Sequence, residues 1–542
     1  MKMSADQDPR PSVDGSAEKA TEMSHESQAS EVQRTLKHVV ENDPDEALKL
    51  VNAHAGETIL LSAEEQSKLL RKIDFSIMPL LCLVYGLNYL DKTTLSYASI
   101  VGFKTDLHIG VSEYNWVASI FYFGYLVWEW PTNWLLQRLP LAKYSAFNVI
   151  LWGSILALTA AVKDLGGALA VRFFLGAAEA AVSPGFVLFT SQWYTTPEQG
   201  TRVSWWFSFN GWGQILGGVI AYGIAVGTEK NPLSIKGWQL IFLVFGLFTA
   251  LLGAVFLYWM PDSQLNARFL TEHERLMAVE RIRQNQQGVG NKHFKWYQCK
   301  EALTDPMIWA FALFSLLANI PNGRHFESNV EYPLMDTVIG GITNYFSQLI
   351  VSFGFTPNQS LLLGIPAGAV QVITLIGFGY LGRRFNNRIL INSLGPLLAI
   401  LGLFLIRFLP SENKGGRLAG YYLWGSSSTG FVCLLSLISS NIAGWTKKTT
   451  AAAMYLVAYC VGNIIGPQVF RPGDAPLYHT ATTVLLVAFV LAYLVMIFIY
   501  FWCRRQNITK ASIRAAPGYS KIEGQEFMDL TDRENLEFIY AL

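Results

Sequence analysis

The sequence predicts an all-α membrane protein with twelve transmembrane helices arranged as two six-helix halves. Hydrophobic residues make up 51% of the 542 positions and charged residues only 15%, whereas a soluble domain carries roughly 25% charged residues. Twelve separate apolar stretches each approach the ~20 residues that a helix needs to cross about 30 Å of hydrocarbon. Short patterns also repeat between the two halves of the chain, which indicates an internal duplication.

The twelve predicted helices are separated by polar or Gly/Pro-rich connectors that favour turns. In chain order they are Phe75–Tyr97, Tyr114–Leu135, Ser145–Val162, Ala168–Trp193, Val203–Val226, Leu240–Met260, Met307–Gly323, Leu361–Leu381, Ile389–Leu409, Leu418–Ile442, Ala451–Phe470 and Ala481–Trp502.

Two patterns carry the duplication. Arg138 and Lys143 follow the second helix, and Arg383 and Arg388 follow the eighth with the same spacing, 245 residues later. The glycine pattern that starts at Gly213 in the fifth helix returns in the eleventh at an offset of 249 residues. Parallel six-helix repeats are the architecture of major facilitator transporters. We therefore expect halves at 62–260 and 307–503, joined by a segment at 261–306.

Basic residues set the expected orientation. One set of loops holds 19 Lys/Arg and the other 9, so the positive-inside rule places both termini and 261–306 in the cytosol. Residues 1–61 are predicted to be a disordered acidic tail without a signal peptide, and 504–542 a second cytosolic tail. A capping box at Thr271 predicts a helix over Glu272–Asn285 within the central segment.

Charged residues inside membrane helices are costly and usually mark a pathway. Lys92 and Arg172 are expected at similar depth, with Glu179 two turns deeper than Arg172 on nearly the same face. Two cations and one carboxylate beside a shared cavity suit an organic anion accompanied by a proton, with Asp91 as a second proton-coupling candidate. The alternative is an internal salt bridge, Arg172 with Asp91 or Lys92 with Glu179, that only holds helices together.

Softer signals complete the candidate site. Polar side chains within predicted helices could hydrogen-bond a substrate, although contacts between helices explain them equally well. The substrate-binding candidates of this kind are Asn210, Gln214, Asn322, Tyr455 and Asn463. Charges near the predicted cytosolic ends are gating candidates, namely Glu129, Arg138, Arg202 and Arg383.

Other functional classes lack support in the sequence. The five Cys are scattered without metal-binding spacing, and the formal net charge is only +1, so no metal site and no nucleic-acid partner are expected. No P-loop, zinc motif or nucleophile elbow is present. We expect neither a cofactor nor an enzyme.

Several motifs resemble the anion:cation symporter family of the major facilitators. Tyr89-Leu-Asp-Lys-Thr-Thr-Leu-Ser-Tyr97 is similar to its first-helix YLDRxNLxxA motif, and Arg172-Phe-Phe-Leu-Gly-Ala-Ala-Glu179 with Ser183-Pro-Gly185 to its fourth-helix RFxLGxxEAxxxPG motif. Motifs typical of the fungal allantoate permease branch also match, including Trp206-Phe-Ser-Phe-Asn-Gly211 and Asp305-Pro-Met-Ile-Trp309. The likeness covers about residues 62–510.

The resemblance implies a monomeric plasma-membrane transporter that takes up a small organic anion with a proton, such as allantoate or another ureide. Nicotinate, a vitamin or a dipeptide is the alternative substrate, and a non-transporting nutrient sensor is the alternative function. In related vesicular glutamate and sialic acid transporters, the positions of Lys92, Arg172 and Glu179 carry anion binding or coupling. The family usually has Arg at Lys92 and Asn at Thr94, and Lys lacks the bidentate fork of Arg.

One interruption departs from the family pattern. Relatives read IPNGGITN continuously in the seventh helix, whereas here Arg324–Gly340 separates the two parts of that motif. The 17 inserted residues are either an external loop or a translated, unspliced intron. Their charges are unsuited to hydrocarbon, so we expect them outside the helix bundle.

Overall fold

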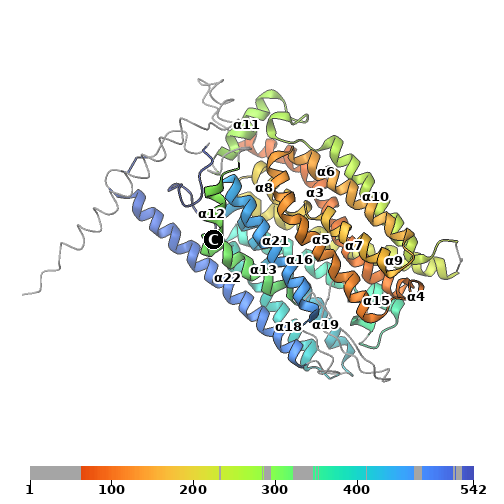
Figure 1. Ribbon diagram of the computed structural model, residues 1–542. Helices are drawn as coiled ribbons and strands as arrows, with labels where there is room; N and C mark the ends of the chain where they lie inside the picture. Colours follow the sequence, from red (N-terminus) through yellow and green to blue (C-terminus); the bar gives the residue numbers. More distant parts are fainter. Residues whose placement is uncertain are drawn as a thin grey trace, which may run out of the picture.

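The computed structural model is an elongated bundle of helices that run side by side (Figure 1). It describes residues 63–230, 234–283, 285, 294–320, 346–347, 349–351, 353–410, 412–468, 479–516, 519–520 and 528–542. Within these ranges the regular structure is entirely helical. The predicted all-α fold class is therefore confirmed for the described part of the chain.

The first half of the bundle contains α3 to α10, and its order follows the predicted helices. Their bounds are α3 Ala63–Ile100, α4 Phe103–Asp106, α5 Val111–Arg138, α6 Leu141–Leu158, α7 Leu165–Glu179, α8 Val182–Trp193, α9 Thr196–Lys230 and α10 Gly237–Trp259. The predicted fourth helix is broken between α7 and α8. Pro184 lacks the N–H that would bond to the carbonyl of Ala180, which accounts for a break at that point.

The second half runs from α13 to α22. Its helices are α13 Pro306–Asn319, α15 Pro357–Leu363, α16 Ile365–Arg384, α17 Arg388–Asn392, α18 Leu394–Phe408, α19 Lys414–Trp424, α20 Ser428–Asn441, α21 Trp445–Gln468 and α22 His479–Arg514. Each of the twelve predicted apolar segments thus falls on one helix or on consecutive helices. The inserted residues Arg324–Gly340 and the predicted acidic tail lie outside the described residues.

Length and apolar composition qualify nine described spans for crossing a membrane, or ten if the bent pair of α12 (Trp296–Thr304) and α13 counts as one. The helices α5 and α9 are long enough, with 28 and 35 residues, but they are not among these spans. Both carry polar side chains on their buried faces, among them Glu129 on α5 and Asn210 and Gln214 on α9.

The central segment contains α11 (Glu272–Arg283) and α12. The predicted capping box is present: Thr271 N–H donates to Glu274 Oε2 at 2.8 Å, and Glu274 N–H donates to Thr271 Oγ1 at 3.3 Å. The sequence did not predict α12, which is only nine residues long. It also ended the last helix at Trp502, twelve residues before α22 ends.

Two glycines allow α5 and α7 to approach closely. A Cβ atom added at Gly124 would lie 1.9 Å from the Phe173 carbonyl oxygen, and one at Gly176 would lie 1.9 Å from the Phe121 carbonyl oxygen. Any side chain at either position would force the helices apart. The contact is reciprocal, so it fixes how α5 and α7 lie against each other.

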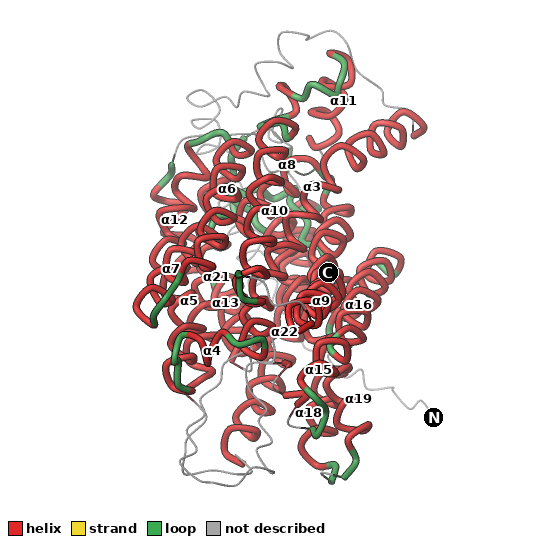
Figure 2. The backbone as a smooth tube through the Cα atoms, turned by 90° about the vertical axis from the view of Figure 1, so that its right-hand side faces the viewer, coloured by secondary structure: helices red, strands yellow, loops and turns green. Residues whose placement is uncertain are grey.

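The bundle has two distinct ends, which we name by the short helices they carry. The α11 end holds α11 and the start of α3, and the α4 end holds α4 and the end of α3 (Figures 1 and 2). Since α3 runs from the first end to the second, residues late in α3 lie toward the α4 end.

Candidate functional site: a cavity between the two halves

A cavity of about 140 Å³ lies between the two halves. Helices α3, α5, α8 and α9 line it from the first half, and α13, α16, α19, α20 and α21 from the second. The lining residues are Tyr85, Asn88, Tyr89, Lys92, Tyr122, Tyr125, Ser183, Phe207, Asn210, Gln214, Ala318, Asn319, Ala367, Gln371, Tyr421, Trp424, Gly425, Ser427, Ser428, Phe431, Leu456 and Tyr459.

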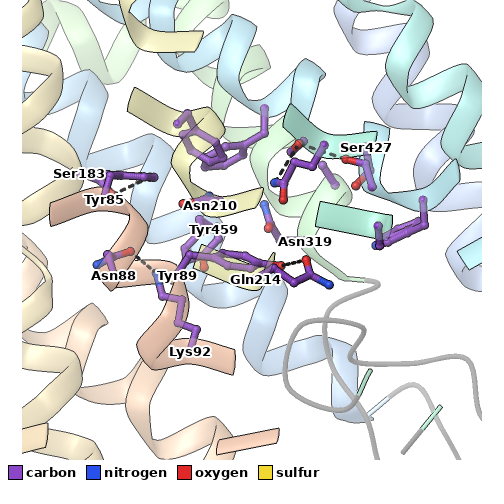
Figure 3. A pocket seen from close by; sticks show the side chains of 18 of the residues that line it. Tyr85, Asn88, Tyr89, Lys92, Ser183, Asn210, Gln214, Asn319, Ser427 and Tyr459 are labelled. Atoms are coloured by element: carbon purple, nitrogen blue, oxygen red, sulfur yellow. Dashed lines mark hydrogen bonds between the residues drawn. The ribbon is translucent and has the colours of Figure 1, made fainter. Parts of the chain in front are cut away.

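Among these lining residues, Lys92 is the one that carries a charge. Its ammonium donates to Asn88 Oδ1 at 3.0 Å, as drawn in Figure 3, and lies 2.6 Å from Glu179 Oε1. The Lys92 side chain is 15% exposed and that of Glu179 is 1% exposed. The cation therefore reaches the cavity, while its carboxylate partner lies behind it in the protein.

Asp91 and Arg172 form a second buried pair, which does not border the cavity. Arg172 Nη1 lies 4.0 Å from Asp91 Oδ1, and the Trp152 indole donates to Asp91 Oδ2 at 2.7 Å. Consecutive residues on an α-helix point about 100° apart. Because Lys92 faces the cavity, its neighbour Asp91 faces α6 and α7 instead. Arg172 pairs with Asp91 and therefore also lies away from the cavity.

Both salt bridges that the sequence analysis offered as an alternative are thus present. They share α3 and α7, so four ionisable groups lie in two pairs across one helix interface. The expectation that Lys92 and Arg172 face a shared cavity is met only for Lys92. The buried carboxylate of Glu179 is charge-paired with the Lys92 ammonium, which lies 2.6 Å from its Oε1.

Neutral hydrogen-bonding groups surround the rest of the cavity. Gln214 from the first half donates through Nε2 to the Gly364 carbonyl and to the Tyr421 hydroxyl of the second half, both at 3.0 Å. Asn210 and Asn319 also line the cavity, and both are labelled in Figure 3. Gln214 therefore links the halves as well as bordering the cavity.

Sequence reasoning missed several lining side chains. Tyr85, Asn88 and Tyr89 share one face of α3 with Lys92, because they recur at the three- and four-residue spacing of a helix. That spacing is visible in the sequence and could have identified them. The second-half residues Gln371 and Tyr421 carry no comparable signal, since no charged residue on their helices marks the cavity-facing side.

Contacts between the halves lie at both ends of the cavity. Toward the α4 end, Ser96 donates to Ser347 at 3.3 Å, and the rings of Tyr97 and Phe346 meet edge to face at 5.5 Å. Toward the α11 end, the Arg388 guanidinium donates to the Thr196 carbonyl. The halves are therefore in contact on both sides of the cavity in this conformation.

Two other substrate-binding candidates do not line the cavity. The Tyr455 hydroxyl donates to the Phe431 carbonyl at 2.9 Å, and the Asn463 amide donates to the Tyr459 carbonyl at 2.8 Å. Both bonds attach the side chain to nearby backbone, which explains why neither reaches the cavity. Asn322 lies outside the described residues.

The gating candidates are spread over the first half and the start of the second. Glu129 is fully buried and accepts from Asn133 at 2.7 Å, and Arg202 binds Asp74 at 2.8 Å. Arg138 lies over the Trp134 ring at 4.2 Å. Arg383 is exposed. The structure does not gather these four into one cluster.

The described residues offer no metal site. In the part of the chain that the structure describes, no group of three or more His, Cys, Asp or Glu is placed to hold a metal ion. The five cysteines are all buried and free.

Comparison with known proteins then decides the family. The model of the Major Facilitator Superfamily matches residues 81–467, which is most of the chain. The chain belongs to the major facilitator superfamily. Members of this superfamily in solved structures share its fold: the proton:xylose symporter XylE superposes with a TM-score of 0.59 at 15% identity, covering 78% of this chain and 96% of XylE.

Curated relatives are fungal transporters. The allantoate permease of Saccharomyces cerevisiae is 38% identical over 511 residues, covering 92% of this chain and 90% of the permease. An uncharacterized transporter of Schizosaccharomyces pombe is 41% identical, covering 89% and 91% of the two chains. A thiamine pathway transporter of S. cerevisiae is 32% identical, covering 88% and 87%. This major facilitator is therefore a multi-pass membrane transporter that is similar to transporters of fungi.

Proposed function

We propose that this chain is a proton-coupled symporter that takes up a small organic anion. The observation that carries the proposal is Lys92, which brings a single positive charge to the cavity and is paired behind it with the buried carboxylate of Glu179. Charged residues inside membrane helices are costly and usually serve a pathway. A cation on a transporter's central cavity fits the carboxylate of an organic anion.

The pair also suggests how a proton is coupled. Protonation of Glu179 removes the negative charge that holds Lys92, so the ammonium becomes available to a substrate carboxylate. Departure of the substrate then restores the Lys92–Glu179 pair once the proton has left. Anion and proton are thereby linked, because each makes binding of the other more favourable. Asp91 is the second proton-coupling candidate, and its partners Arg172 and Trp152 position α3 against α6 and α7 in our proposal.

We propose a ureide such as allantoate as the substrate class. The cavity lining offers amide side chains at Asn88, Asn210, Gln214, Asn319 and Gln371. A ureide presents several N–H donors and C=O acceptors besides its carboxylate, and amides satisfy both kinds of group. The similarity to the allantoate permease supports this choice. Nicotinate, a vitamin and a dipeptide remain the competing substrates that an experiment must separate.

We further propose a monomer in the plasma membrane with the α11 end and both termini in the cytosol. The excess of Lys and Arg in the loops predicted for that side supports the orientation. A cysteine at Arg268, which is exposed before α11, tests it. An impermeant thiol reagent added to intact cells should leave this cysteine unlabelled until the cells are opened.

The decisive test of the function is uptake in cells that lack their own ureide transport. Cells that express the chain should accumulate labelled allantoate, and unlabelled ureides should compete better than pyridine carboxylates or dipeptides. Lys92→Gln should abolish accumulation, whereas Lys68→Gln, which removes an exposed cation on the same helix, should not. Expression at the cell surface without any flux would instead favour a sensor.

A further inference from the structure

The last fifteen residues, 528–542, fold back onto the α11 end of the bundle. They contact α12 of the central segment and α20 and α22 of the second half, and the chain end lies beside α12 in Figure 1. We call residues 528–542 the C-terminal segment. The sequence analysis expected only a tail here.

The bundle holds the main chain of the last three residues through a row of hydrogen bonds. Asn507 of α22 donates to the Tyr540 carbonyl and accepts from the Tyr540 N–H, both at 2.8 Å. Asn441 of α20 pairs in the same way with Ala541, at 2.9 and 2.8 Å. The Arg388 N–H then donates to the Leu542 carbonyl. Three helices, α22, α20 and α17, thus each hydrogen-bond the main chain of one of three consecutive residues.

A buried lysine fixes the fold of the rest of the C-terminal segment. The Lys510 ammonium donates to the carbonyls of Asp532, Asn535 and Phe538. It also lies 5.3 Å from the centre of the Phe538 ring and 4.8 Å from that of Tyr540. A cation surrounded by three carbonyls and two rings needs this segment in place, because burial without partners is unfavourable.

The segment also contributes to a buried ion cluster. Lys447, at the start of α21, is fully buried and lies 2.7 Å from Asp532 Oδ1. Its other partners are Glu301 at 2.8 Å and Asp305 at 3.0 Å. Docking therefore joins the segment to α12, α13 and α21 at once.

The end of the segment borders the seam between the halves. A cavity of about 460 Å³ is lined by residues 537–542, by Arg388, and by Thr195–Pro197 at the start of α9. The same Arg388 whose backbone binds Leu542 donates through its guanidinium to the Thr196 carbonyl. One residue thereby connects the chain end to the contact that closes the α11 end.

We propose that the C-terminal segment is a latch that holds the α11 end of the transporter closed. Transport by alternating access requires the halves to separate at that end. Separation breaks the bond from Arg388 to Thr196, and a docked segment keeps Arg388 where it can make that bond. Release of the segment therefore favours the conformation open at the α11 end. The proposal requires only that the chain is a transporter, and not the proposed substrate or coupling ion.

The test measures two quantities separately in the purified full-length protein: the release of the C-terminal segment and the separation of the halves at the α11 end. Spin labels at Leu139 and Arg384, which are both exposed and lie on opposite halves at the α11 end, report the separation of the halves. Alkylation of a cysteine at Glu537 reports release of the segment, and the buried native cysteines give a low background. Lys510→Gln is the main variant, and Arg504→Gln, an exposed cation on the same helix, is its matched control.

We expect Lys510→Gln to raise the alkylation rate at Glu537 roughly tenfold and to shift the Leu139–Arg384 distances toward a longer population by a similar factor. The control should change neither. If Lys510→Gln does not fold, Asn507→Ala removes only the two bonds to Tyr540 and should give the same changes to a smaller extent. A released segment with an unchanged distance distribution would overturn the latch. Since neither readout involves substrate, a failed uptake assay cannot be mistaken for a failed latch.

Discussion

Replacement of Glu179 by Gln should separate binding of the anion from coupling to the proton. The change keeps the shape of the side chain but removes the charge 2.6 Å from the Lys92 ammonium. Removal of one partner from a buried ion pair costs about 3–5 kcal/mol. Lys92 keeps its bond to Asn88 and a contact with the Phe121 ring at 5.9 Å, so we expect the lower figure, about 3 kcal/mol.

A bound anion should recover much of that loss. Its carboxylate would replace the missing charge beside Lys92, so saturating allantoate should raise the melting temperature of Glu179→Gln more than that of the wild type. In proteoliposomes, wild-type uptake should fall as the external pH rises, because fewer protons are available to neutralise Glu179. The variant imitates the protonated state permanently, so it should exchange labelled for unlabelled substrate at a rate independent of pH and should not accumulate it.

The matched control is Glu64→Gln, which breaks an exposed pair with Lys68 on the same helix and should behave as wild type. Accumulation by Glu179→Gln with the wild-type pH dependence would refute the reasoning. Coupling would then lie at another carboxylate, with Asp91 the next candidate and Glu129 after it.

Three further predictions follow from particular contacts. Gly176→Ala should destabilise the protein by about 3 kcal/mol or more in thermal unfolding, since its Cβ would meet backbone at 1.9 Å, whereas Gly223→Ala, with nothing within 4 Å, should be neutral or slightly stabilising. Lys92→Arg should retain uptake with an altered affinity in competition assays, because Arg offers a bidentate fork, and complete loss of transport would argue against a simple anion contact. Burial tends to raise the pKa of Glu274, but hydrogen bonds from Lys72 and Thr271 outweigh it and hold the pKa below its usual value. Its contribution to stability is therefore present above the unfolded pKa of about 4.3 and is lost as the pH falls through the folded value. Glu274→Gln should therefore be less stable than the wild type at pH 7 by about 0.5 kcal/mol, and this difference in unfolding free energy should shrink as the pH falls through the folded pKa of Glu274.

The sequence was sufficient for the helices and for the depth of the charges, but not for the direction in which each charge points. The length of an apolar stretch predicts a membrane helix, and the number of residues from its end gives the depth of a side chain in the membrane. Whether Arg172 faces the cavity or Asp91 depends on the rotation of α7 against α3, which tertiary packing decides. The short helix α12 and the docked C-terminal segment were missed for a related reason. Both are polar segments whose stability comes from specific partners such as Lys447 and Lys510. The periodicity of apolar residues in the sequence does not identify such partners.

The two halves contribute different kinds of side chain to the cavity region. The charged pair belongs to α3 and α7 of the first half, whereas every described lining residue of the second half, from Ala318 to Tyr459, is neutral. A substitution in the second half can therefore reshape the cavity without disturbing the ion pair. Under the proposed mechanism, exchanges between neutral residues of the second half would alter substrate choice and leave the Lys92–Glu179 pair in place.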